Sequence, residues 1–218
     1  MSTFTFFLFL AYFIAAGIAF SYVLREADKI YIVDRTGERW DVTQAKSIGF
    51  DPHRFQYGIG KEAFTPLDDS YLSDDTSFIS KGLRIIGVAG GTEAHAYSIS
   101  KLRRHEIANT TIDSKPIAVG YWPLVNLAAV YSRQIDDRTL TIVPSGWTYK
   151  NTFVLYDRET ETLWYPYGKG LMGIQGKYFK RWLPKVSSED TRWAKWKDKY
   201  TESKILEWAI NKVYQQLV

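Results

Sequence analysis

The chain has 218 residues, a formal net charge of +4 and no cysteine. The lack of cysteine excludes disulfides, thiolate nucleophiles, cysteine-ligated zinc and iron–sulfur clusters, and so small a charge does not indicate nucleic acid as a partner. Aromatic residues make up 16% of the chain, more than a core of this size needs, which points to binding surfaces.

The first segment, residues 1–24, carries no charged side chain. Its apolar run is long enough to cross a bilayer, since a helical span needs about 20 residues. We therefore expect residues 3–24 to form one transmembrane helix that anchors the chain in a lipid bilayer. The alternatives are a cleavable signal peptide, against which the missing basic n-region argues, and a core helix, which would have to be apolar on every face.

Alternating apolar and polar residues after the anchor predict antiparallel hairpins. Their turns are expected at residues 34–37, at 136–138 and near 158–159. Further strands are expected from RIIGVAGG and EAHAYSI, and PIAVGYWP, apolar on both faces, is typical of a buried strand. Residues 51–81 are expected to be a long ordered loop, because their aromatic side chains provide apolar surface to bury.

Two helices are predicted at the C-terminus. The first, residues 188–200, has Trp193, Trp196 and Tyr200 at helical spacing on one face, and the second, from about residue 203 to 217, carries an apolar stripe. Both stripes are most simply packing faces; alternatively, the three aromatic residues are interface candidates. The fold class expected is mainly β (α+β): one antiparallel, hairpin-rich domain over residues 25–218 with two C-terminal helices.

The residues that could carry chemistry form no complete catalytic pattern. His105, Glu106 and Asn109 match the HExxH zinc motif except that asparagine replaces the second histidine, and zinc catalysis on that motif needs two imidazoles. Ser145 lacks the glycine-flanked elbow of a nucleophilic serine, and no phosphate-binding glycine loop is present. We therefore predict no catalytic residue, no metal site and no cofactor.

Aromatic residues beside prolines suggest a weak ligand site. Tyr121, Trp122 and Trp164 could line a cleft for a flat ligand or a sugar, although core and hairpin packing is the simpler alternative. They join the polar candidates His105, Glu106 and Asn109. Basic residues crowd the C-terminal third among aromatic ones, which favours an anionic lipid surface or a protein partner over single-stranded nucleic acid.

The stretch from Gly91 to Tyr200, and more loosely from Phe64, resembles the domain-of-unknown-function family 3179, found in bacterial exported and membrane-attached proteins. The resemblance rests on AYSISKLRRHEIANTTIDSKPIAVGYWPL, SGWTYKNTFVLYDRETETLW, the glycines Gly168 and Gly173, and WAKWKDKY. The family has no settled activity, so the resemblance implies an extracytoplasmic β-rich domain rather than a reaction.

The chain departs from the family at one motif. Where the family commonly reads Tyr-Cys-Pro-Leu-Cys, this chain has Trp122 and Val125 in place of the cysteines. If those cysteines bind metal or cycle between redox states, this protein cannot do so, and we expect both replacements to pack against neighbours. The resemblance also favours a periplasmic location, although Arg25 and Lys29 after the anchor favour the cytoplasm by the positive-inside rule.

Two functions are consistent with these features. The first is a membrane-anchored, extracytoplasmic interaction or scaffold domain, an accessory subunit of an integral-membrane assembly such as a respiratory or photosynthetic complex. The second is a ligand-binding or enzymatic domain with a site around His105, Glu106 and the aromatic cleft. The first is favoured, and the protein is not expected to be an enzyme.

Overall fold

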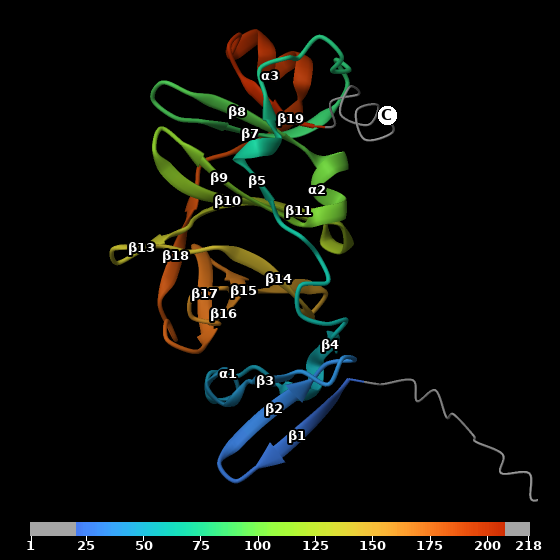
Figure 1. Ribbon diagram of the computed structural model, residues 1–218, viewed down its shortest axis with the longest axis vertical. Coiled ribbons are helices and arrows are strands. Elements are labelled where there is room, and N and C mark those ends of the chain that lie inside the picture. Colours follow the sequence, from blue (N-terminus) through green and yellow to red (C-terminus); the bar gives the residue numbers. More distant parts are fainter. Residues whose placement is uncertain (1–20, 208–218) are drawn as a thin grey trace, which may run out of the picture.

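The computed structural model describes residues 21–207, whose strands form four sheets. Figure 1 shows the sheets stacked along the longest axis, with the N-terminal strands at one end and helix α3 at the other. Helices are few and short, so the fold is mainly β: α1 (Thr43–Ser47), α2 (Ile99–His105) and α3 (Trp193–Lys199), with 3-10 turns η1 (Pro52–Arg54), η2 (Asp69–Tyr71) and η3 (Pro123–Val125).

The N-terminal sheet is antiparallel and contains β1 (Tyr22–Glu26), β2 (Lys29–Val33) and β3 (Arg39–Asp41). Asp34 forms the turn between β2 and β3. Its Oδ1 accepts hydrogen bonds from the backbone N–H of Thr36 (2.9 Å) and Glu38 (3.1 Å), and its Oδ2 accepts one from Trp40 Nε1 (3.0 Å). The hairpin predicted at residues 34–37 is thus confirmed, and a buried carboxylate explains its turn.

The central sheet has ten strands in the order β4 (Phe55–Tyr57), β14 (Ile142–Tyr149), β15 (Thr152–Asp157), β16 (Leu163–Tyr167), β17 (Gly170–Gln175), β18 (Trp182–Val186), β11 (Leu127–Ser132), β10 (Lys115–Trp122), β9 (Ile107–Ile112) and β5 (Leu67–Asp68). The sheet folds back on itself, because Ile107 and Tyr131 from one arm share a core cluster with Phe153 and Trp164 from the other. The predicted hairpin near residues 158–159, between β15 and β16, and the predicted buried strand β10 are both confirmed.

The third sheet contains β19 (Glu189–Arg192), β7 (Arg84–Ala89), β8 (Ala94–Ser98), β20 (Lys204–Leu206) and β6 (Leu72–Ser73). The remaining pair, β12 (Gln134–Ile135) and β13 (Arg138–Thr139), closes the turn predicted at residues 136–138. The hairpin is limited to these four residues, because β11 before it pairs with β10 and β18, and β14 after it pairs with β15 and β4. β7 and β8 confirm the strands expected there. Residues 51–81 were expected to be a loop, and they contribute β4, β5 and β6 as short edge strands.

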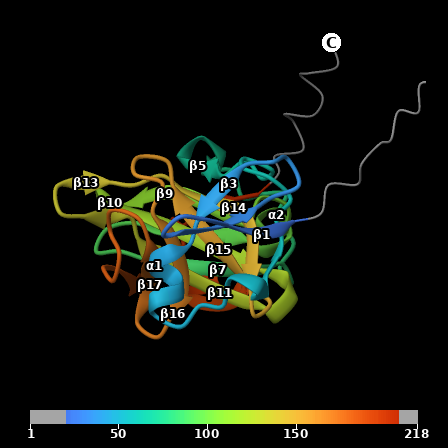
Figure 2. The same cartoon turned by 90° about the horizontal axis from the view of Figure 1, so that it is seen from below.

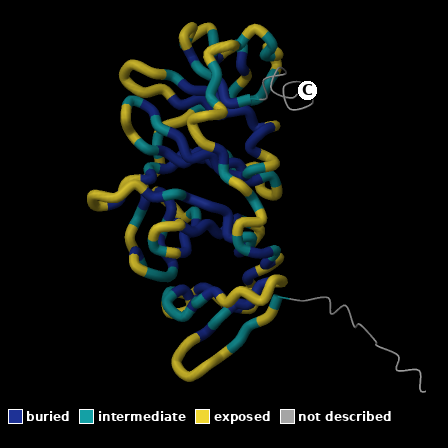
Figure 3. The backbone as a smooth tube through the Cα atoms, in the orientation of Figure 1, coloured by how far each residue is buried: buried dark blue, intermediate teal, exposed yellow. Residues whose placement is uncertain are grey.

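Apolar side chains fill the spaces between successive layers. The first cluster lies between the N-terminal sheet with α1 and the arm β14–β17, and the second lies inside the folded central sheet. The third lies between β9–β11 and the layer of α2, β7 and β8, and the fourth lies under α3. Seen from below, α1 and β1–β3 cover one end of the molecule (Figure 2). Buried backbone runs through the middle of every layer, whereas the turns are exposed (Figure 3).

Both predicted C-terminal helices need correction. Residues 189–192 form strand β19, which pairs with β7, so the helix expected over 188–200 begins only at Trp193. Residues 204–206 form strand β20 parallel to β8, where a second helix was expected; residues 208–217 of that helix lie outside the described residues. Pairing with an existing sheet edge outweighs the local helical pattern in both places.

The predicted anchor lies mostly outside the described residues. Its last residues, 22–24, belong to β1 and pair with β2, so the expected helix does not extend to residue 24. Between residues 21 and 207, no helix is long and apolar enough to cross a membrane.

Candidate functional site

Glu106 stands between the end of α2 and the start of β9. Its backbone N–H donates to the carbonyl of Leu102 (2.6 Å), and its own carbonyl accepts from the N–H of Tyr121 (2.9 Å). Its φ is +63°, a conformation that is uncommon outside glycine and costs on the order of 1–3 kcal/mol. These contacts hold the residue with its side chain inside the protein, where it is only 4% exposed.

An apolar pocket with a volume of about 340 Å³ opens beside Glu106. It is formed where four segments distant in the sequence meet: β4 with the loop after it, the end of α2, the start of η3 and the middle of β14. Most of its wall is apolar or aromatic and comes from Tyr57, Ile59, Phe64, Trp122, Leu124 and Trp147. A concave, apolar space of this size with a few polar groups is typical of small-molecule sites.

A β-bulge in β14 shapes one wall of the pocket. The pairing with β15 shifts register between Pro144 and Thr148, and Gly146 in the bulge has a φ of +77°. A Cβ at Gly146 would lie 2.7 Å from the carbonyl oxygen of Gly60, so only glycine fits there. Ser145 stabilises the bulge, because its hydroxyl donates to the Val154 carbonyl (2.6 Å) and accepts from the Trp147 N–H (3.1 Å).

Polar groups without a hydrogen-bond partner belong to three residues that line this pocket, and two of these groups are fully buried. Burial raises the pKa of Glu106 to about 8, and none of the residues between 21 and 207 hydrogen-bonds or ion-pairs with its carboxyl group. The indole N–H of Trp147 and the hydroxyl of Thr148 are also buried without a hydrogen-bond partner in the described chain. Unpaired buried polar groups are rare because each costs about 1–3 kcal/mol, so their concentration at one pocket calls for an explanation.

At neutral pH the Glu106 carboxyl is mostly protonated, because its pKa lies above the pH. A protonated carboxyl can donate a hydrogen bond, and the Trp147 indole can only donate. At the pocket, Glu106 therefore presents a donor rather than a negative charge. Arg103, whose side chain is exposed, also lines it.

Of the ligand candidates predicted from the sequence, the structure brings Glu106 and Trp122 together at the pocket. Trp122 packs edge-on against Phe153, with ring centroids 5.7 Å apart, and its Nε1 donates to the carbonyl of Asn151 (2.6 Å). This agrees with the expected packing of Trp122. The same expectation for Val125 is wrong, because η3 leaves that side chain 45% exposed.

The other polar candidates hold the fold together. His105 Nδ1 lies 2.8 Å from the carbonyl oxygen of Thr65. Asn109 bridges the two arms of the central sheet: its Nδ2 donates to the Ile142 carbonyl (2.8 Å) and its Oδ1 accepts from the Ile142 N–H (3.0 Å). Neither residue lines the pocket.

The remaining aromatic candidates lie elsewhere. The Tyr121 hydroxyl donates to Asn126 Oδ1 (3.0 Å). Trp164 is buried in the central core, where its Nε1 donates to Asp157 Oδ2 (2.9 Å). Sequence reasoning missed Trp147 and Thr148, although an isolated glycine in a strand pattern, here Gly146, is a signal for a bulge.

The interface candidates belong to the layer under α3. Trp193 and Trp196 are buried between α3 and β7, and Trp196 Nε1 donates to Ser203 Oγ (2.8 Å). Tyr200 is half-buried and packs on Trp196, with ring centroids 4.3 Å apart. This placement matches the packing alternative that the sequence left open.

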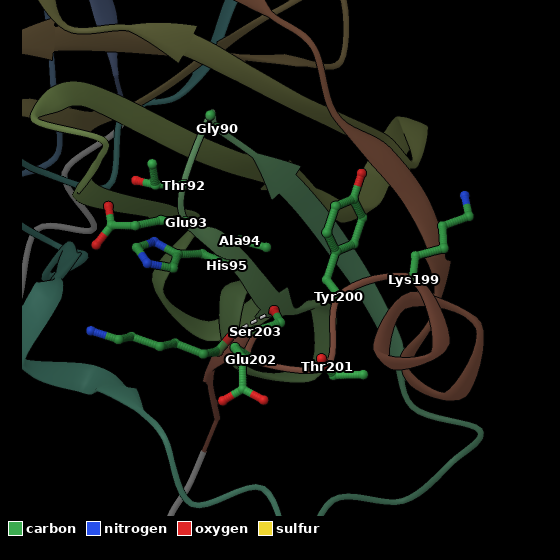
Figure 4. Close-up of a pocket in the computed structure, with 12 residues that line it drawn as sticks. Gly90, Thr92, Glu93, Ala94, His95, Lys199, Tyr200, Thr201, Glu202 and Ser203 are labelled. Atoms are coloured by element: carbon green, nitrogen blue, oxygen red, sulfur yellow. Dashed lines mark hydrogen bonds between the residues drawn. The ribbon is translucent and has the colours of Figure 1, made fainter.

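A second cleft, about 310 Å³ in volume, lies between the β7–β8 turn and the segment after α3 (Figure 4). His95 and Glu93 line one side and Tyr200 the other. Burial lowers the pKa of His95, and its Nδ1 lies 3.5 Å from the Tyr97 hydroxyl. Residues 21–207 contain no group of three histidine, cysteine or acidic side chains placed to hold a metal ion.

The fold and the pocket define a mainly β protein with a buried, unpaired carboxyl at an apolar cavity. Its sequence matches the profile of the family described as "Protein of unknown function (DUF3179)" over residues 64–216. The chain belongs to this family. Comparison with curated proteins and with solved structures finds no match.

Proposed function

We propose that the protein is a ligand-binding module whose pocket beside Glu106 takes up a small apolar molecule with a hydrogen-bond-accepting oxygen. The observation that carries this proposal is the buried Glu106 carboxyl, which has no partner in the described chain yet lines an apolar cavity. A ligand oxygen would satisfy it. This is the ligand-binding alternative of the sequence analysis, with Glu106 and Trp122 retained and Trp147 and Thr148 added.

The ligand oxygen that suits this pocket belongs to a neutral carbonyl group. The protonated Glu106 carboxyl is a hydrogen-bond donor at neutral pH, so it complements an acceptor. Placing an anion among apolar walls would cost more than placing a neutral group, which favours a ketone, aldehyde or quinone carbonyl. The aromatic side chains of Trp122 and Phe64 supply apolar contact for the rest of the molecule.

Acetophenone and α-methylstyrene test this proposal, because the second compound replaces the carbonyl oxygen by a CH₂ group with little change in shape. Saturation-transfer NMR on the full-length protein should show acetophenone binding about 3-fold to 10-fold more tightly at pH 6.5, as one hydrogen bond provides. The preference should shrink above pH 8, where ionised Glu106 no longer donates.

Glu106→Leu should abolish the preference for acetophenone, whereas Glu202→Gln, a change at an exposed residue after α3, should leave it intact. Equal affinity of the wild-type protein for the two compounds, or no binding of either, contradicts the proposal.

We also propose, from the sequence, that the uncharged segment before β1 holds the protein at a lipid bilayer with its globular part on the extracytoplasmic side, beside an integral-membrane assembly. The uncharged run of residues 1–24 and the family's exported members support this. Full-length protein should remain in the membrane pellet after a carbonate wash and copurify with a larger complex in mild detergent. Protection of residues 25–207 from protease in intact spheroplasts would contradict the orientation.

A further inference from the structure

A further and larger groove, with a volume of about 690 Å³, lies at the end of β14, where Tyr149 lines it. It is formed by the loop after α1, the β14–β15 turn and strands β16–β18, and α1 itself lies against β17 (Figure 1). Among residues 21–207, no residue lines both this groove and the pocket beside Glu106. The groove is therefore a separate feature of the molecule.

Aromatic rings form much of the groove wall. Tyr167 on β16 is 60% exposed, and its ring lies 6.2 Å from that of Trp182, at an interplanar angle of 38°. Deeper in the groove, Phe50 packs edge-on against Tyr165, whose hydroxyl donates to the carbonyl of Tyr149 (3.1 Å). The inner rings are thus fixed by the fold, whereas Tyr167 and Trp182 offer partly exposed ring faces to a ligand.

The charged side chains at the groove are all positive. Lys150 and Lys180 line it, and Lys169 holds its Nζ 5.0 Å from the centroid of the Trp182 ring. None of the described residues that line the groove is acidic, and within residues 21–207 no carboxylate ion-pairs with these three lysines. A concave surface that carries only positive charges attracts anions and disfavours cations.

We infer that this groove binds a small organic anion with a flat ring, such as an aromatic carboxylate. The ring stacks against Tyr167 and Trp182, and the carboxylate ion-pairs with Lys150 and Lys180. The volume falls within the range of about 300–1,000 Å³ that is typical of small-molecule sites. The ligand differs from that of the pocket beside Glu106, which favours a neutral molecule, and the inference is independent of the function proposed above.

The positive charge of two groove lysines can be removed by substitutions that suit their backbone conformation. Lys150 and Lys180 have φ values of +49° and +62°, and asparagine adopts such left-handed conformations more readily than lysine does. Lys150→Asn and Lys180→Asn therefore remove a charge without disturbing the turns. Lys81→Asn, at an exposed turn before β7, is the matched control. Tyr167→Ala removes an exposed ring and should leave the unfolding temperature unchanged.

The probes are 2-naphthoate and 2-naphthylmethylammonium, which share the ring and differ in the sign of the charge. Calorimetric titration of the full-length protein at low salt should show binding of naphthoate only. The double variant Lys150→Asn/Lys180→Asn should bind naphthoate about 10-fold more weakly, as should Tyr167→Ala, since each change removes about 1.4 kcal/mol of interaction. Lys81→Asn should bind like the wild type.

Three results would overturn the inference: equal affinity for the two probes, unchanged naphthoate affinity in the double variant, or tighter binding of a polyglutamate peptide than of naphthoate. The last would identify an acidic protein segment as the occupant. Failure of these titrations would leave the acetophenone experiment unaffected, because Glu106→Leu alters only the other pocket.

Discussion

Replacing Glu106 by glutamine removes the ionisable group from the apolar pocket while keeping its shape. Burial raises the pKa of Glu106 from 4.5 to about 8 in the folded protein. Between these pH values the folded state holds a proton that the unfolded state has released, so the free energy of unfolding falls as the pH rises. The contribution of Glu106 is fully present below pH 4.5 and is lost as the pH rises through about 8.

The size of the effect follows from the width of this range. Each pH unit between the two pKa values changes the free energy of unfolding by about 1.4 kcal/mol. The difference between Glu106→Gln and wild type should therefore grow by about 3 kcal/mol in favour of the variant from pH 5 to pH 7, and should level off above about pH 8.

Urea unfolding of the full-length protein, followed by tryptophan fluorescence at pH 5, 6, 7, 8 and 9, measures this difference. Subtracting the wild-type profile cancels the other titrating groups, His95 among them. Glu202→Gln is the control and should run parallel to wild type. If the Glu106→Gln profile also runs parallel to wild type, the carboxyl is not held in its protonated form, and the donor role proposed for it fails.

Three further substitutions test contacts that hold the layers together, each by denaturant unfolding. Asn109→Ala should destabilise the protein by about 2–4 kcal/mol, because it leaves the N–H and carbonyl of Ile142 unpaired; a loss below 1 kcal/mol would show that the two arms do not depend on this bridge. Arg133→Met should cost a similar amount, about 2–4 kcal/mol, because the buried guanidinium donates to three backbone carbonyls; an unchanged or higher stability would refute the role of this buried cation. Trp196→Ala should lower the free energy of unfolding by about 3–5 kcal/mol, because it is a large-to-small change in the core. An unchanged stability together with loss of a copurifying complex would instead show that Trp196 lies at an interface.

Raised pKa values in buried side chains are common at functional sites, but burial alone can produce them. Glu106 is distinguished by its surroundings. Other buried carboxylates have partners in the fold: Asp34 and Asp157 each accept a hydrogen bond from a tryptophan Nε1 and from a nearby backbone N–H. These two stabilise hairpin turns, whereas no described residue satisfies the Glu106 carboxyl.

Local patterns in the sequence were sufficient to predict much of the sheet structure. Turn residues and alternation around residues 34–37 and 158–159 predicted two hairpins, because the sequence-local carboxylates of Asp34 and Asp157 close those turns. The apolar run of β10 predicted a strand buried on both faces. The family was also accessible from the sequence.

Tertiary structure decided the conformation of residues 189–192 and 204–206. Their side chains have helical spacing, but β19 and β20 pair with residues of β7 and β8 that lie more than a hundred positions away in the chain. The hydrogen bonds of that sheet outweigh the local preference. Tertiary structure also separated the candidate residues, leaving Glu106 and Trp122 at the pocket and placing Asn109 and Trp164 in structural roles.

The sequence by itself determined the hairpins around residues 34–37 and 158–159 and the buried central strand, because neighbouring residues alone produce these features. Only the tertiary structure decided that Glu106 lines the same pocket as Trp147 and Thr148, since the latter two lie on β14 and come to the pocket through the folding of the ten-stranded sheet. The same folding buries the carboxyl and so raises its pKa, because the cost of burying a charge depends on surroundings that are assembled from distant parts of the chain.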